Sequence, residues 1–488
     1  MNTMNNMNAA NAANEVQQAP EKPVREYDGF VVSAGARDLS AALKYLDVAS
    51  SDTITFSHSG ECEKRVDEKG GERTFEIFDL VRGGASAVVR KKFAFAFVPV
   101  VIRDGNIAPW KGAFSRTKGC EAFAVDAKKF VEIVDILSEM GSVIRLIVDC
   151  NSMTVTLATK RGDGQQTKMF LPCKDASSLT ELSVLPEGAT VYAEAMLQAA
   201  PFKGFAVGSG LVGSCAGKEE KLLLNIVENA IRYIDSAKSA SYVGMIDKLK
   251  TKLHQSHRAD TLYGVASPQT FRSIAAKFER DAKLHIAVIG MEGSPSGLLI
   301  SDESVGLSYR IPFKNETADA SLYERLQKFA QFPVMYSMRF LRDDFNRACN
   351  LINIVDAENK HLRLIVVPGQ ELRIGACKRT DNYNETGLRA KIERKSENAV
   401  EPLETGFDSG FFGALLKACI VKTEQVDGVD REIPVSVDIL SAGPGKNVYR
   451  FNDLPEHVSM VLAPVALEAP AKEEAPAASD DAAEAAEA

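Results

Sequence analysis

Apolar residues recur along the chain in six stretches of helical period, and each stretch is followed by short segments that alternate in the manner of β-strands. The predicted helices begin near residues 37, 126, 193, 268, 342 and 408, and two or more predicted strands separate each helix from the next. Tight turns join these strands, so the pattern excludes a doubly wound parallel sheet, in which every crossover needs a helix. The sequence predicts an α+β chain of antiparallel sheets with helices on one face.

The apolar stripes also predict the extent of each helix. Pro201 is expected to end the third helix, and Ser267-Pro268 forms an N-cap and N1 pair at the start of the fourth. The six helices are therefore expected over Arg37–Leu46, Asp126–Met140 and Ala193–Ala200, from Ser267-Pro268 onward, over Arg342–Ile354, and after a cap at Asp408 or Ser409.

Six helix-and-strand units in a body of this length predict three domains, each made of two like halves. The expected divisions are a disordered arm over residues 1–26, domains over 27–188, 189–331 and 332–467, and an acidic disordered tail over 468–488. The arm is rich in Asn, Ala, Met and Gln, and the tail in Ala, Glu, Asp and Pro, so neither has enough apolar residues to form a core.

Composition narrows the class of protein. The chain has 488 residues, of which 45% are hydrophobic and 25% charged, and these values exclude a collagen-like or wholly disordered chain. Apolar runs stay well short of the roughly 20 residues that a membrane-spanning helix needs, and the first thirty residues lack a secretory signal pattern. Eight cysteines stand singly, which favours reduced thiols in a cytoplasm over a disulfide framework or a zinc site.

The net charge of −8 is concentrated at one end of the chain. Residues 468–488 hold seven acidic residues and one lysine, a net charge of −6, which leaves the body close to neutral. Two interpretations of this acidic tail stay open. It either keeps the protein soluble or screens and competes for a neighbouring site.

Three short motifs invite an enzymatic or metal-binding interpretation that their context does not support. Gly208, Gly210 and Gly213 form a G-x-G-x-x-G pattern, but a strand and not a helix is expected to follow it. The stretch 213–218 is one residue short of a P-loop. His254 and His257 lie in a Lys-rich stretch without a nearby carboxylate cluster, which favours a surface loop over a metal site. We therefore expect no catalytic residue, metal or cofactor.

The order of the six units resembles the bacterial DNA polymerase III beta subunit, the sliding clamp. The segments that carry the resemblance are FLRDDFNRACNLINIV, HLRLIVVPGQELRIGA, TGFDSGFFGALLKAC and the terminal VSMVLAPVAL, with LLLNIVENAIRYIDSAKSASYVGM and GVASPQTFRSIAAKF before them. The Gly-His-Arg triplet of the family is replaced by Ser239 to Ser241. Extra sequence occurs around residues 61–71, 104–119 and 248–260, and the acidic tail is a further addition. The chain thus resembles a distant member of the family, of a type found in phages.

The resemblance implies a DNA clamp fold of three domains and a non-enzymatic role in the bacterial or infected-host cytoplasm. Clamps are head-to-tail homodimeric rings that encircle duplex DNA without sequence specificity and tether the replicative polymerase. The polymerase and the clamp loader dock through peptides. Whether the ring has two or three chains stays open. The alternative is a clamp-fold scaffold or interaction protein of a replication complex that does not encircle DNA.

The resemblance also implies two sets of site residues. Exposed helix cations would face DNA, although each alone could be an ordinary surface charge: Arg37, Lys44, Lys128, Lys129, Lys203, Arg272, Lys277, Arg280, Arg342, Arg347 and Lys417. The second set would line an apolar pocket for partner peptides: Ser239, Ser241, Tyr242, Leu462, Pro464, Val465 and Leu467. Leu462 and Val465 fit a core strand equally well.

Overall fold

The computed structural model describes residues 27–66, 70–85, 87–103, 106–112, 114, 121–176, 184–186, 188–208, 221–237, 240–254, 263–265, 268–291, 294–313, 328, 331–355, 361–367, 369, 371–377, 384–420, 422–426, 429–441, 447–454 and 458–467. The arm and tail expected at residues 1–26 and 468–488 lie outside these residues. The described chain forms two compact units. Unit one takes its residues from Met1–Leu39, Phe56–Phe78 and Ala94–Ser178, and unit two takes the rest.

Unit one is built on antiparallel strands in the order β1-β7-β8-β9-β6-β2-β3-β4, and β4 pairs back with β1. The first residues of β2 and β4 and the last of β3 belong to unit two. A short strand, β5, extends β4 as a hairpin. The bounds are β1 Gly29–Gly35, β2 Thr53–Val66, β3 Glu72–Arg82, β4 Val88–Arg103, β5 Asn106–Pro109, β6 Ala122–Asp126, β7 Val143–Asp149, β8 Thr154–Lys160 and β9 Gln166–Asp175.

Aromatic side chains form the core of unit one beneath its helices. The helices are α1 (Ala36–Leu43), whose residues from Ser40 onward belong to unit two, and α2 (Ala127–Met140). The 3-10 turn η1 (Lys44–Val48), which follows α1, also belongs to unit two. Asp126 caps α2 by accepting a hydrogen bond from the Lys129 backbone N–H at 2.8 Å. Phe56 stacks on Phe123 at 4.7 Å between ring centroids and meets Phe130 of α2 edge-on.

The first sheet of unit two runs β18-β17-β16-β10-β14, with the start of β4 paired to β18. Its strands are β10 Thr190–Gln198, β14 Lys250–Leu253, β16 Lys283–Met291, β17 Ser294–Asp302 and β18 Leu307–Pro312. The helices beside it are α3 (Ala199–Gly208) and α5 (Pro268–Ala276), and a 3-10 turn, η2 (Glu303–Val305), follows β17. Phe202 of α3 and Phe271 of α5 meet edge-on at 5.0 Å in the core.

A second, nine-stranded sheet of unit two runs β15-β11-β12-β13-β29-β28-β27-β19-β23. It joins segments that are far apart in sequence, because β13 pairs antiparallel with β29. Its strands are β11 Lys221–Val227, β12 Ala230–Ala237, β13 Ala240–Ile246, β15 Tyr263–Val265, β19 Val334–Phe340, β23 Ala390–Arg394, β27 Val435–Ser441, β28 Asn447–Phe451 and β29 Val458–Leu462.

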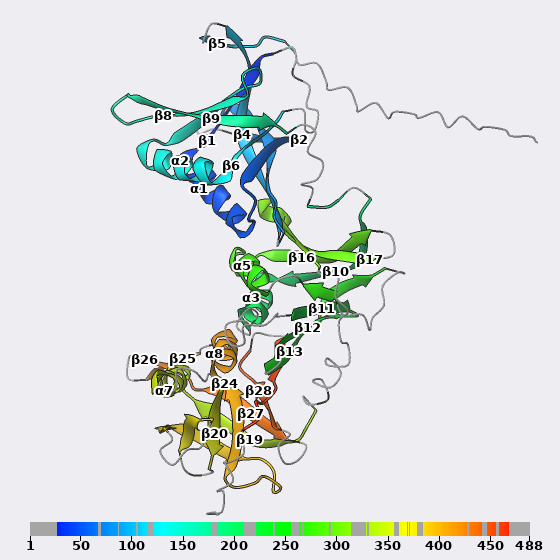
Figure 1. The fold of residues 1–488 in the computed structure, drawn as a ribbon, viewed down its shortest axis with the longest axis vertical. Helices are drawn as coiled ribbons and strands as arrows, with labels where there is room; N and C mark the ends of the chain where they lie inside the picture. The colour runs from blue at the N-terminus through cyan, green and yellow to red at the C-terminus, as the bar shows by residue number, and fades with distance from the viewer. Residues whose placement is uncertain are drawn as a thin grey trace, which may run out of the picture. The chain divides into compact units, whose positions relative to one another are not determined.

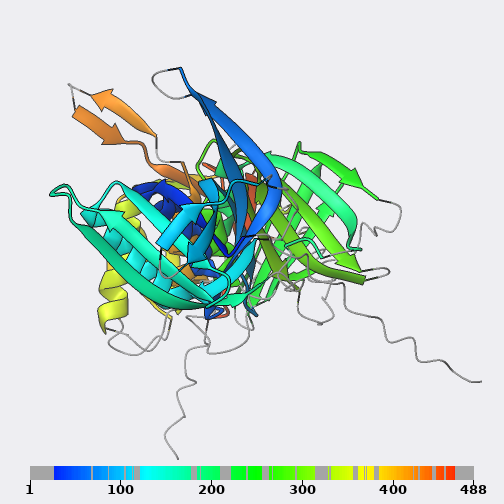
Figure 2. The ribbon, with the colours of Figure 1, turned by 90° about the horizontal axis from the view of Figure 1, so that it is seen from above.

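The remaining strands of unit two form a four-stranded sheet, β22-β21-β20-β24, and a separate β25–β26 ribbon (Figures 1 and 2). Helices α7 (Arg342–Val355) and α8 (Ser409–Ala418) pack here through Phe345 and Phe412, which stack at 4.7 Å. The strands are β20 His361–Val366, β21 Leu372–Ala376, β22 Glu385–Leu388, β24 Leu403–Asp408, β25 Thr423–Val426 and β26 Val429–Glu432.

The structure confirms the α+β class, the antiparallel pairing and five of the six helices, and it corrects the third. Residues Ala193 to Gln198 belong to β10, and the helix, α3, begins at Ala199. Pro201 therefore lies in the first turn of the helix, where its missing N–H has no intrahelical acceptor to lose. The expectation failed because a proline that can end a helix can equally well lie near its start.

Within unit two the helical segments contact one another in the order α7, α8, α3, α5 and η1. Figure 1 shows α5, α3 and α8 in a row, with β16, β10, β11 and β13 to their right. Among the described residues, no helix combines the length and the apolar character required to cross a membrane.

Candidate functional site

Most of the predicted helix cations lie at the surface. Seven of them have exposed side chains for which the structure gives no ion pair among the described residues: Arg37, Lys44, Lys128, Lys129, Arg272, Arg280 and Lys417. Asp126 caps the helix that carries Lys128 and Lys129, so both begin the exposed first turn of α2. Long, exposed and unpaired cations are the type of group that contacts phosphates without fixed geometry.

Four of the cations lie around the end of α5 in unit two: Lys44, Lys203, Lys277 and Arg280. Lys277 Nζ lies 2.9 Å from the Lys44 carbonyl and 2.7 Å from Asp47 Oδ1. Lys203 Nζ donates to the carbonyl of Phe278, two residues before Arg280. Lys203 and Lys277 are therefore engaged in local contacts that hold α3, α5 and η1 together, which leaves Lys44 and Arg280 as the available charges there.

The two arginines of α7 are balanced by acidic neighbours on the same helix. Arg342 Nε lies 3.7 Å from Asp343 Oδ1, and Arg347 Nη1 lies 3.5 Å from Asp344 Oδ1. Such exposed pairs contribute little to stability, but they reduce the positive potential that α7 presents. Its first turn is the least basic of the predicted DNA-facing positions.

The structure brings the two predicted walls of the peptide pocket together. Tyr242 of β13 stands directly opposite Leu462 of β29 in the antiparallel register, although 220 residues separate them in the sequence. Ser241 pairs with Ser236 on the other side of β13. Ser239 lies outside the described residues.

The residues after β29 cross from one sheet of unit two to the other. Val465 N–H donates to the Gly406 carbonyl of β24 at 3.1 Å, and a Cβ at Gly406 would collide with the Val465 carbonyl. Leu462 is 0% exposed and Val465 is 8% exposed, so both pack in the interior. Pro464 and Leu467 are half-buried and are the members of this wall that reach the surface.

A cavity of about 990 Å³ lies elsewhere in unit two, around Glu194 of β10. His285 Nε2 lies 2.9 Å and Lys252 Nζ 3.2 Å from the Glu194 carboxylate, and His254 Nε2 lies 3.5 Å away. The hydrogen bond from His285, and then that from Lys252, holds the pKa of Glu194 below its usual value. Sequence reasoning missed this cluster because β10, β14 and β16 bring its members together only through their register.

His254 therefore faces a carboxylate, whereas His257 lies outside the described residues. Across the residues that the structure places, no group of three or more His, Cys, Asp or Glu side chains is arranged to hold a metal ion. Of the glycine-rich motifs, Gly208 ends α3 and residues 209–218 lie outside the described chain.

Sequence reasoning also missed a polar cavity of about 740 Å³ near the β23 edge of the nine-stranded sheet, which we call the Arg339 groove. Strands β19 and β27 form its floor, and the loop after β23 forms one wall. It is lined by Pro333, Val334, Ser337, Arg339, Lys395, Ser396, Ser436, Asp438, Asn452 and Asp453. No local sequence pattern signals it, since its members come from four separate segments.

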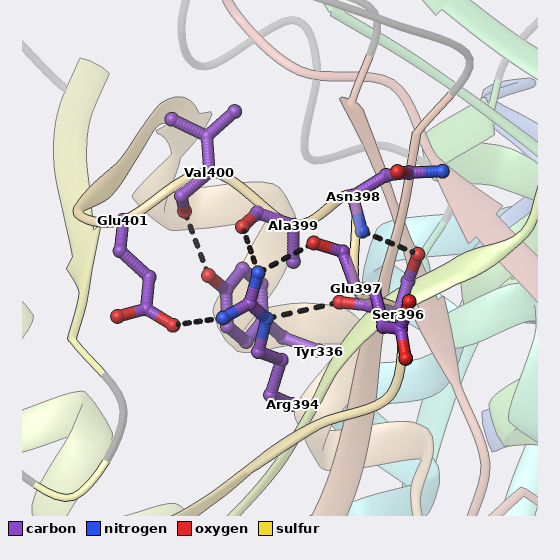
Figure 3. A network of polar contacts seen from close by, with 8 residues as sticks. All are labelled: Tyr336, Arg394, Ser396, Glu397, Asn398, Ala399, Val400 and Glu401. Carbon is purple, nitrogen blue, oxygen red and sulfur yellow. Dashed lines mark hydrogen bonds and ion pairs between the residues drawn. The ribbon is translucent and has the colours of Figure 1, made fainter.

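Arg394 fixes the wall of this groove (Figure 3). Its guanidinium donates to the carbonyls of Ser396, Glu397 and Ala399 at 3.0, 2.6 and 3.0 Å, and to Glu401 Oε1 at 2.8 Å. Tyr336 Oη donates to the Val400 carbonyl at 2.7 Å. One planar, always charged group thus satisfies three backbone acceptors of a loop that would otherwise need water.

Comparisons with known proteins bear on the fold. No family model matches the chain, and no curated protein matches it by sequence. Solved structures do match. A sliding clamp from Bacillus subtilis covers 90% of this chain and 100% of its own at 10% identity and a TM-score of 0.59. The DNA polymerase III subunit beta of Borrelia burgdorferi covers 91% and 99% at 7% identity, with a TM-score of 0.60. A clamp from Pseudomonas aeruginosa covers 90% of this chain and 100% of its own at 12% identity, with a TM-score of 0.60.

These matches confirm the resemblance inferred from the sequence. The chain has the DNA clamp fold of the bacterial DNA polymerase III beta subunits, at a sequence identity that fits a distant relationship. Identities this low carry the fold alone, and function has to be argued from the surfaces described above.

Proposed function

We propose that this chain is a non-enzymatic sliding clamp, a processivity factor that encircles duplex DNA in the cytoplasm of a bacterium or of a phage-infected host. The observation that carries the proposal is the length over which the chain matches clamp structures. The clamp fold accounts for about 90% of this chain and for essentially the whole of each matched clamp. A chain that kept only one clamp-like domain for another purpose would not align over that length. We retain the predicted division into three domains over residues 27–188, 189–331 and 332–467.

The exposed cations on the helices are suited to holding DNA without stopping it. Contacts from mobile lysine and arginine side chains to phosphates release counterions and carry no sequence information. A ring then retains DNA by enclosure, and a docked polymerase stays close to its primer terminus at a high effective concentration. In this proposal the cations that are exposed and have no ion partner among the described residues contribute most, with Lys128, Lys129, Arg272 and Arg280 among them.

Partner peptides from the polymerase and the clamp loader are proposed to dock beside the β13–β29 junction. Pro464 and Leu467 offer half-buried apolar surface there, and Leu462 and Val465 support it from beneath. A few apolar anchors in such a pocket would supply most of the binding energy. Ser239, Ser241 and Tyr242 would form the opposite wall, without the histidine and arginine of the family triplet.

The ring requires a second copy of the chain, and exposed apolar side chains provide candidate surfaces for it. Leu351, Ile354 and Val355 lie on one face at the end of α7, and Ile354 is 77% exposed. On β9 of unit one, Phe170 offers a second exposed apolar surface, since its side chain is 71% exposed. We propose that these two patches meet in a head-to-tail contact between copies, which closes into a ring when repeated. Two copies are expected from three domains each.

One observation favours the alternative, a clamp-fold scaffold that does not encircle DNA. Arg342, Arg347 and Lys277 pair with acidic side chains, and Lys203 is engaged by a carbonyl, so four of the eleven predicted cations are already occupied. A surface weakened in this way would fit a protein that binds only other proteins.

Two measurements separate these functions. Size-exclusion chromatography with light scattering is expected to show a closed dimer, and a strict monomer would contradict a ring. Retention of the full chain on nicked circular DNA, loaded with a clamp loader or at high concentration, is expected to be lost when the DNA is linearised. Equal retention on both forms would show ordinary surface binding and favour the scaffold.

A further inference from the structure

The Arg339 groove presents hydrogen-bond donors that converge on one volume. Asn452 Nδ2 donates to Ser436 Oγ at 3.3 Å, and the Asn398 backbone N–H donates to Ser396 Oγ at 3.2 Å. Each hydroxyl therefore accepts a hydrogen bond from the protein and keeps its own proton to donate to a ligand. Ser396, Ser436 and Arg339 line the same cavity. This set of donors is suited to an oxyanion.

The charges of the groove point to the same ligand. Its two acids already have partners: Asp438 accepts from Arg450 at 2.7 Å, and Asp453 accepts the Ser436 backbone N–H at 2.6 Å and lies 3.9 Å from Lys422 Nζ. Lys395 and Lys391 share one carboxylate, that of Glu393, at 2.7 and 3.0 Å. Arg339 is exposed and forms no ion pair or hydrogen bond with any other described residue. Positive charge is thus left over at the rim and floor.

The wall of the groove is held in place before any ligand arrives. Arg394 binds three carbonyls of the loop that carries Lys395 and Ser396 (Figure 3). Because this loop is already ordered, a ligand does not have to pay for ordering it, and a preorganised site binds more tightly for the same contacts. Arg394 is therefore a positioning residue, and it does not itself line the groove.

We propose that the Arg339 groove is a carboxylate-binding site and that its occupant is the acidic tail of the same chain, residues 468–488. The tail holds seven acidic residues against one lysine. Leu467, the last described residue, packs over Gly406 of β24, and β24 begins at Leu403, immediately after the loop that walls the groove. Twenty-one residues reach up to about 70 Å when extended, far more than this separation along the strand. Attachment also gives the tail a millimolar effective concentration.

This proposal does not depend on DNA encirclement, and it selects between the two interpretations of the tail left open by the sequence. The tail would compete with any anionic partner that approaches this outer face of the sheet. The same donors would accept a phosphoryl group, so inorganic phosphate is the appropriate probe for a site that binds small anions and not the tail.

The test uses the full chain with its tail neutralised by Glu→Gln and Asp→Asn at 468, 473, 474, 480, 481, 484 and 487. A fluorescent peptide of residues 468–488 is titrated with this variant and with the native chain, and its anisotropy is measured at low salt. The neutralised chain is expected to bind the peptide at least tenfold more tightly, because the native tail competes for the groove. Equal affinity for the two chains would overturn the proposal.

Three further variants, each in the neutralised chain, locate the site. Arg339→Glu is expected to weaken peptide binding at least tenfold, and Lys168→Glu, an exposed charge on β9, is expected to change it less than twofold. An equal loss in both variants would indicate unspecific attraction and overturn the proposal. A larger loss from Arg280→Glu would place the tail on the helices instead. A third outcome would also overturn the proposal: millimolar phosphate displaces the peptide, but the native and neutralised chains bind the peptide equally. The groove would then be a site for small anions only.

Discussion

The helix cations and the Arg339 groove are two basic regions of one molecule, and they are built in opposite ways. On the helices, Lys128, Lys129, Arg272 and Arg280 extend singly into solvent, and no described side chain holds them in position. In the groove a single unpaired arginine is accompanied by two oriented hydroxyls and a braced loop. Dispersed charges suit a partner that must move, whereas an arginine beside oriented hydroxyls and a braced loop suits a partner that stays. Charge alone therefore does not distinguish a sliding surface from a docking site; the polar groups arranged around the charge do.

The largest expected effect comes from reversing the dispersed charges together. A variant with Lys128, Lys129, Arg272 and Arg280 changed to Glu is expected to bind nicked circular DNA roughly 100-fold more weakly at low salt, since about four phosphate contacts are lost. The slope of log affinity against log salt should fall by about four. Peptide binding in the groove should be unchanged.

The matched control reverses four exposed cations on strands: Lys168, Lys174, Lys250 and Arg431. It has the same change in net charge, so DNA binding should fall only through the weaker overall field. An equal loss in both quadruple variants would contradict a specific role for the helices.

A smaller effect is expected from pH, which should weaken peptide binding in the groove but not DNA binding by the helix cations. Hydrogen bonds from Lys395 and then Lys391 lower the pKa of Glu393 to about 2, so this carboxylate beside the groove stays ionised down to that pH. In a free peptide, Asp and Glu carboxylates have reference pKa values of about 4, so those of the tail peptide become neutral first. Peptide affinity is therefore expected to fall about tenfold between pH 5.5 and 3.5, as measured by anisotropy, and to recover on return to pH 5.5.

DNA phosphates keep their charge over this range, so DNA binding by the helix cations should not fall in parallel. Circular dichroism at each pH checks that the chain stays folded. A parallel loss of peptide and DNA binding without unfolding would contradict the distinction between the two regions.

The smallest effect tests the bracing of the groove. Arg394→Ala is expected to weaken tail-peptide binding threefold to fivefold and to speed hydrogen exchange in residues 395–402, because three carbonyls lose their donor. Arg394→Lys keeps the charge but not the planar fork, so it should behave like the alanine variant. If Arg394→Lys retained native exchange rates, charge and not geometry would hold the loop.

The sequence alone determined the elements that depend on local patterns. The stripes of α2, α5, α7 and α8, and the cap at Asp408, follow from the spacing of apolar residues and from one carboxylate that accepts the Phe411 N–H. The order of the six units was enough to indicate the clamp fold. The third helix shows the limit of this reasoning, because Pro201 fits the start of a helix as well as its end.

Only the tertiary structure decided what lies next to what. Tyr242 faces Leu462, Glu194 gathers two histidines and a lysine, and Arg339 shares a cavity with Ser396 and Ser436, although tens to hundreds of residues separate these partners in the sequence. It also buried Leu462 and Val465, which the sequence left open between core and pocket. The physical reason is strand register. Helical periodicity is written into neighbouring residues, whereas cross-strand contacts depend on how separate segments align, and a shift of one residue would replace every one of them.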